Sequence, residues 1–197
     1  MKTVLFAGVV LTFAAAAVAQ NQTPNGTQNQ TPSYTSSGSE DIEFVLDAAK
    51  GGMAEVELGK LAAERSQNDE VKKFAQRMVD DHTKANAQLK QIADSKSIKL
   101  PADVEGKDKA LMQRLEKLNG PAFDRAYMTA MVSDHQKDVN EFKHEANAGR
   151  DSQVKSFASS TLPTLEEHLQ QAKTARGEVS TVRTSSTTKS STTSGNN

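Results

Sequence analysis

The sequence contains no cysteine and no tryptophan, and only 5% of its residues are aromatic. Without cysteine the chain has no disulfide framework, no thiolate metal ligand and no thiol nucleophile. Its 24 Lys and Arg residues nearly balance 25 Asp and Glu residues, giving a formal net charge of −1. This balance provides no electrostatic basis for binding nucleic acid or an anionic membrane surface, so neither is predicted as a partner.

Long apolar runs are also absent, apart from one at the start of the chain. Lys2 precedes the apolar run Val4–Val18, and Ala17-Val18-Ala19 has the A-x-A form of a cleavage site. These features predict a signal peptide over residues 1–19. The run is shorter than the roughly 20 residues that span a bilayer. We therefore predict an exported protein, periplasmic or extracellular, that is not stably inserted in a membrane after signal cleavage. Whether the segment is cleaved or kept as an anchor stays open.

Two polar segments flank the central part of the chain. Residues 20–39 are rich in Asn, Gln, Thr, Pro and Ser, and residues 179–197 are rich in Ser and Thr. Segments of this composition bury too little apolar surface to offset the entropy lost on ordering. They predict a disordered linker and a disordered tail on either side of a folded region, residues 40–178.

Within the folded region, apolar residues recur every three or four positions, which predicts helices. We expect four long helices and one short one, at residues 40–66, 68–95, 121–147 and 151–177, and at 104–118. Pro163 is expected to kink or split the last helix. Gly51-Gly52 is expected either to kink the first or to allow a neighbour to approach closely.

The connections between these helices predict the fold. Two of them are tight turns, and the only long one joins the second long helix to the third and carries the short helix. The sequence therefore predicts an all-α, ferritin-like four-helix bundle with one long crossover carrying a short extra helix.

A repeated motif marks a candidate site. Met78-Val79-Asp80-Asp81-His82 is echoed by Met131-Val132-Ser133-Asp134-His135, and each histidine falls on the apolar stripe of its helix. His168 falls similarly in the last helix, and Glu55 in the first. At 1.5 Å per residue, all four lie within about one turn of the middle of their helices. They are predicted to meet in one layer of the core.

Three imidazoles and a carboxylate from four helices can bind a transition-metal ion. The predicted ligands of a copper, zinc or iron ion are His82, His135, His168 and Glu55. Met78 and Met131, one turn before two of the histidines, would favour copper, especially Cu(I). Asp138 could add an oxygen, and Glu57 is an alternative to Glu55 as the inward-facing carboxylate.

A second interpretation needs no metal. A histidine on an apolar face is often a core residue that hydrogen-bonds a neighbour, because burying an unsatisfied imidazole is costly. The histidines would then form a hydrogen-bonded polar layer in a non-catalytic structural or protein-interaction module. Asp81, Asp134 and Glu167 each precede a histidine and point about 100° away. They are expected to be solvated or to support a histidine of a neighbouring helix.

No catalytic residue is predicted. The sequence has no glycine-rich phosphate loop, no G-x-S-x-G elbow and no H-E-x-x-H helix. An enzymatic activity is therefore not favoured.

Three segments resemble a known family. Gly51–Ala62, both copies of the repeated motif and Leu162–Leu169 are similar to the bacterial exported family called domain of unknown function 4142. The resemblance covers about Glu40 to Ala175. It implies a ferritin-like fold and a location in the bacterial envelope, but no established activity.

Classical ferritins use Glu-x-x-His pairs for a di-iron centre. In this chain the residues three positions before His82, His135 and His168 are Val79, Val132 and Leu165. A di-iron site and ferroxidase activity are therefore not predicted.

Overall fold

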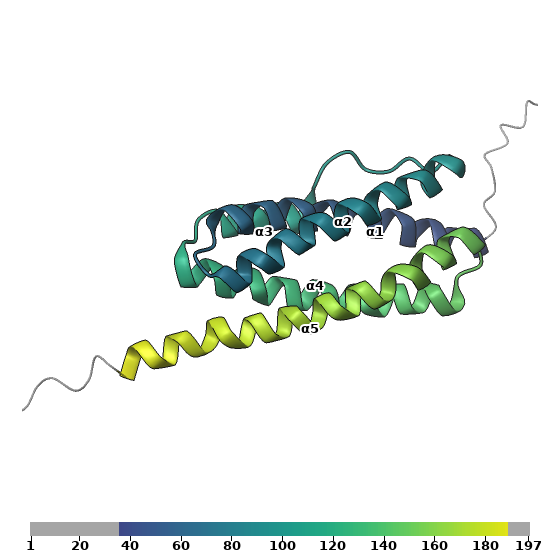
Figure 1. Cartoon of the computed structure of the whole chain (residues 1–197). Helices are drawn as coiled ribbons and strands as arrows, with labels where there is room; N and C mark the ends of the chain where they lie inside the picture. Colours follow the sequence, from purple (N-terminus) through teal and green to yellow (C-terminus); the bar gives the residue numbers. More distant parts are fainter. Residues whose placement is uncertain (1–35, 189–197) are drawn as a thin grey trace, which may run out of the picture. The chain divides into compact units, whose positions relative to one another are not determined.

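The computed structural model describes residues 36–188, whose regular elements are all helices (Figure 1). They are α1 (Ser36–Arg65), α2 (Asp69–Ser95), α3 (Gly106–Leu115), α4 (Gly120–Ala148) and α5 (Ser152–Thr188). The all-α class is confirmed. The predicted signal peptide, most of the predicted linker and residues 189–197 lie outside the described residues.

The four long helices form a closed bundle, in which α1 and α5 each pack against both α2 and α4. The Ser66 hydroxyl donates to Asp124 Oδ1 at 2.6 Å, which places the α1–α2 turn beside the start of α4. At the other end, Asp41 accepts hydrogen bonds from the backbone of Arg150 and Asp151. Helices α1 and α5 therefore run in one direction and α2 and α4 in the other. The α2–α4 connection travels the length of the bundle and carries α3, which confirms the ferritin-like topology.

Buried apolar side chains form two clusters, one towards each end of the bundle. The first includes Met78 and Met131, and the second includes Leu89 and Phe142. Because α2 contributes to both, His82 falls between the two clusters along that helix, and His135 does so along α4. A polar layer therefore separates two apolar halves of the core.

Glycine lets α1 and α2 approach closely. A Cβ atom at Gly59 would lie 2.9 Å from the carbonyl oxygen of Ala75, and one at Gly52 would clash with the side chain of Asn86. Helix α1 continues through both positions. Of the two alternatives for Gly51-Gly52, close approach is the one observed, and it involves Gly52.

Several predicted boundaries were wrong. Helix α1 begins at Ser36, inside the predicted linker, where the hydrogen bonds of Asp41 fix its first turns. Helix α5 continues past the predicted end at residue 177, and Val179 is buried in the same cluster as Ala172. Residues 179–188 of the predicted tail are part of this helix. Pro163 does not split α5. Helix α3 is shorter than the predicted 104–118.

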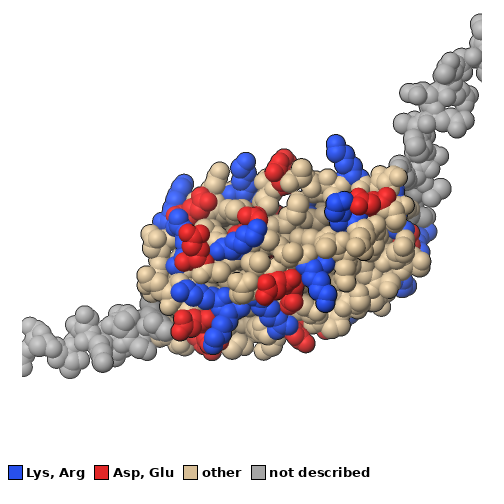
Figure 2. All heavy atoms as spheres, turned by 45° about the horizontal axis from the view of Figure 1, so that its top comes forward, with Lys and Arg blue, Asp and Glu red and all other residues tan. Residues whose placement is uncertain are grey.

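Charges of both signs are interspersed on the face of the bundle in Figure 2, which shows no extended region of one sign. Several exposed charges of the bundle pair one helical turn apart, as Lys73 does with Glu70 and Lys90 with Asp94. None of the helices within residues 36–188 combines the length and apolar character needed to cross a membrane.

Candidate metal centre

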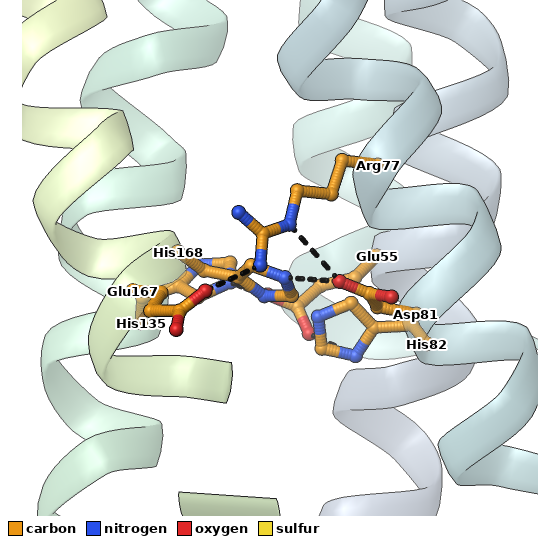
Figure 3. A network of polar contacts seen from close by, with 7 residues as sticks. All are labelled: Glu55, Arg77, Asp81, His82, His135, Glu167 and His168. Atoms are coloured by element: carbon orange, nitrogen blue, oxygen red, sulfur yellow. Dashed lines mark hydrogen bonds and ion pairs between the residues drawn. The ribbon is translucent and has the colours of Figure 1, made fainter. Parts of the chain in front are cut away.

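Each long helix places one buried polar residue in the layer between the apolar clusters (Figure 3). Glu55 comes from α1, His82 from α2, His135 from α4 and His168 from α5, and they are between 0% and 7% exposed. The centroids of the three imidazole rings are 5.3 to 5.7 Å apart. The four residues therefore lie in one layer, as their positions along the helices predicted. Their role as metal ligands stays a prediction.

Glu55 is the inward-facing carboxylate. Its Oε2 lies 3.0 Å from His82 Nδ1, and its Oε1 lies 3.2 Å from His135 Nδ1. The His135 Nδ1 hydrogen points instead to the carbonyl oxygen of Met131, at 3.0 Å, so Glu55 Oε1 is buried with no hydrogen bond. The alternative, Glu57, pairs with Lys60 at the surface.

His168 is connected to the surface by a chain of charged groups. Its Nε2 donates to Asp81 Oδ2 at 2.8 Å, and Asp81 also accepts from Arg77 Nε at 3.1 Å. Arg77 Nη2 donates to Glu167 Oε2 at 2.7 Å, which fastens α2 to α5 (Figure 3). Asp81 therefore supports a histidine of a neighbouring helix, one of the two roles considered for it. The sequence did not predict that Arg77 takes part in this network, because Arg77 lies off the apolar stripe of α2.

The partners of each imidazole determine which nitrogen carries a lone pair. In a neutral ring only one nitrogen is protonated. His135 donates from Nδ1 and His168 from Nε2, which leaves His135 Nε2 and His168 Nδ1 as two lone pairs only 3.3 Å apart. His82 Nε2 is also buried, without a hydrogen-bond partner. One nitrogen from each ring lies within 4.8 Å of the other two. Such a cluster of bases is stabilised by a cation.

Burial favours the neutral forms of these groups, because desolvation shifts each pKa towards the uncharged state. Desolvation, followed by the neighbouring His135 and His168, lowers the pKa of His82 to about 3. Desolvation likewise lowers the pKa of His168 to about 4, against the hydrogen bond to Asp81. It raises the pKa of Glu55 well above 4.5, and the charge of Asp134 adds to this. Neutral imidazole is the form that binds metal ions.

A cavity of about 450 Å³ reaches the layer from the side, between α1, α3 and α4. Glu55 contributes to its lining, together with Asp108 of α3 and Asp134 and Asp138 of α4. Periodicity could not predict this cavity, because it gives no position for a crossover helix relative to the bundle.

The two methionines of the repeated motif are fully buried in the apolar cluster that includes Phe74 and Leu115. Their burial is accounted for by packing. The preference for Cu(I) that rested on Met78 and Met131 thus stays a prediction.

Fold and site together define a ferritin-like helical bundle with a buried histidine cluster. The sequence profile of the family described as "Domain of unknown function (DUF4142)" matches residues 14–175, and the chain belongs to this family. The resemblance found in the sequence is confirmed. No curated protein matches the chain.

Solved structures of DUF305 proteins are similar in fold. One, from Streptomyces coelicolor, is described as a candidate secreted protein; it is 16% identical, with a TM-score of 0.63 over 72% of this chain and 92% of its own. A DUF305 fragment from Deinococcus radiodurans is also 16% identical, with a TM-score of 0.63 over 71% of this chain and 96% of its own.

Proposed function

We propose that this protein binds one first-row transition-metal ion through His82, His135 and His168. One observation supports the proposal above the others. One nitrogen of each buried imidazole lies within 4.8 Å of a nitrogen of the other two rings. Each ring also has a nitrogen that lies against a carboxylate or a carbonyl oxygen. Metal-binding histidines are typically oriented in this way by an acceptor on the far nitrogen.

The nitrogen ligands favour particular ions. Imidazole suits copper, zinc and iron, and affinity generally rises from Fe²⁺ to Cu²⁺ and falls again at Zn²⁺. We therefore expect Cu²⁺ to bind most tightly and Zn²⁺ next. A water molecule would complete a four-coordinate site. The two Glu55 oxygens lie against Nδ1 of His82 and Nδ1 of His135, which are the nitrogens turned away from the ion. Glu55 would ionise on binding, because the ion offsets the cost of its buried charge.

Metal content is the first test. The protein, purified without an affinity tag or chelator, should contain close to one ion per chain by mass spectrometry, and should take up Cu²⁺ in titration. A His82→Ala, His135→Ala double variant should lose both properties. His144→Ala is the matched control, since His144 lies exposed on the same helix as His135. Uptake by the double variant equal to that of the control would refute the proposal.

The polar links of the layer support a second candidate function. The contacts from Arg77 to Asp81 and Glu167, and from Asp81 to His168, tie α2 to α5 without an ion. A non-catalytic structural or interaction module could use the layer to fix helix register. In that case the double variant and the wild-type protein would bind copper equally weakly.

Export is the remaining part of the proposal. It is supported by the signal peptide predicted over residues 1–19 and by the description of the Streptomyces coelicolor neighbour as a candidate secreted protein. Fractionation of bacteria that express the full chain should recover it from the periplasm or the medium. Recovery in the cytoplasm, with the first residues still present, would contradict export.

A further inference from the structure

The cavity beside the histidine layer has an acidic lining. Six carboxylate residues and three lysines line it: Asp47, Glu55, Glu105, Asp108, Asp134, Asp138, Lys50, Lys107 and Lys137. Each lysine has a carboxylate within 4.0 Å. Lys50 pairs with Asp47 at 2.9 Å, Lys107 lies 4.0 Å from Asp108, and Lys137 pairs with Glu141 at 2.8 Å.

One carboxylate of the cavity lining, that of Glu55, has an oxygen with no hydrogen bond. Glu55 is 3% exposed, and its Oε1 has no hydrogen-bond partner. One of its carboxylate oxygens lies within 4.8 Å of a carboxylate oxygen of Asp138 and of a His135 nitrogen. A buried oxygen without a donor is costly, and a cation would satisfy it.

We propose a second cation subsite, held by the carboxylates of Glu55 and Asp138 in the lining of this cavity, for a small divalent cation such as Mn²⁺ or Mg²⁺. His135 Nδ1 donates to the carbonyl oxygen of Met131 and so has no lone pair for this ion. The protein ligands are therefore oxygens, which hard cations prefer.

The volume of the cavity agrees with this chemistry. Mg²⁺ and Mn²⁺ are six-coordinate and are commonly held by one or two carboxylates while retaining several water molecules. A cavity of about 450 Å³ has room for an ion with such a shell. The subsite goes beyond the proposed function, because His82 and His168 take no part in it.

Manganese titration followed by electron paramagnetic resonance tests the subsite, because protein-bound Mn²⁺ loses the sharp signal of the free ion. The wild-type protein should bind one Mn²⁺ per chain and release it to excess Mg²⁺. Asp138→Asn should weaken Mn²⁺ binding by at least about tenfold, since it removes one of two charged ligands. Asp47→Asn makes the same change elsewhere in the cavity wall and should have no such effect.

A double variant, His82→Ala with His168→Ala, separates this subsite from the histidine site. It should keep its Mn²⁺ and lose Cu²⁺, whereas Asp138→Asn should keep Cu²⁺, which also shows that this variant is folded. Absence of Mn²⁺ binding by the wild-type protein, or binding that Asp138→Asn leaves unchanged, would overturn the subsite. Loss of Mn²⁺ only from the histidine variant would place the ion at the imidazoles and overturn it equally.

Discussion

The approach of His135 to His168 is unusual for two imidazoles, because the nitrogens that face each other at 3.3 Å both carry lone pairs in the neutral rings. A shared proton would resolve this conflict. Burial opposes that solution, however, by lowering the pKa of His168 to about 4. Under the proposed function, the double positive charge of a metal ion would stabilise both lone pairs without protonation of either ring.

Glu145, far from the histidines, gives a prediction on stability at the scale of the residue. It is 4% exposed, and burial, together with the charge of Asp41, raises its pKa to about 7. An acid with a raised pKa in the folded state destabilises the fold as it ionises. Stability should therefore fall by about 2 kcal/mol as the pH rises from 4.5 to 7.

The Glu145→Gln variant should lack this fall, since a neutral amide can donate to Asp41 as the protonated carboxyl does. Urea unfolding at pH 5, 6, 7 and 8 measures the difference. Glu166→Gln, an exposed substitution of the same kind on α5, is the control and should keep the wild-type profile. Identical profiles for both variants would show that Glu145 does not cause the pH dependence.

At the scale of the helix, the closeness of α1 and α2 depends on Gly59. A Cβ atom there would lie 2.9 Å from Ala75 O and 3.0 Å from Val79 Cγ2, so Gly59→Ala must separate the two helices. We expect it to cost about 1–3 kcal/mol in thermal or urea unfolding. At Gly51 nothing lies within 4 Å of the added carbon, and Gly51→Ala should instead stabilise α1 by about 0.5–1 kcal/mol. Equal effects of the two substitutions would contradict this account.

Helix periodicity predicted the elements better than their ends. The apolar stripe of α2 predicted both ends of that helix to within one residue. Asn68 caps its start, where the side-chain oxygen accepts hydrogen bonds from the backbone N–H groups of Glu70 and Val71. The end of α5 was predicted too early, at residue 177, whereas the buried Val179 extends the apolar stripe beyond it. The apolar stripe of a helix shows which residues face the core. The length of the helix depends in addition on how far its neighbouring helices extend beside it.

At the scale of the whole molecule, a metal ion would join all three histidine-bearing helices. Ligand binding stabilises the folded state in proportion to the logarithm of free ligand, by about 2.7 kcal/mol at one hundred times Kd. Wild-type protein in buffered Cu²⁺ should gain this amount in urea unfolding.

His82→Leu should remove the gain. It should lower the metal-free stability by about 1–3 kcal/mol, because Leu removes the Nδ1 partner of the buried Glu55 Oε2. A gain in copper that persists in the variant would contradict a site at His82. A metal-free loss well above about 3 kcal/mol would favour the structural polar layer.

The site itself was partly predictable. The predicted helix lengths gave the position of each residue along the bundle axis. These positions were enough to predict that one layer contains Glu55, His82, His135 and His168. The topology of the bundle determines which helices are neighbours, and so determines that His168 contacts Asp81. The apolar pattern of a single helix does not contain this information. The cavity depends further on where the crossover places Asp108, and no local pattern carries that information.

The three histidines come from three different helices of the bundle, with the last of them on α5. An unfolded chain holds them far apart, and the α1–α2 hairpin alone carries only one of them. A nascent or translocating polypeptide would consequently have no chelating site. Under the proposed function, the ion is therefore acquired in the compartment where the chain completes its folding, and synthesis of the protein does not deplete the metal pool of the compartment where it is made.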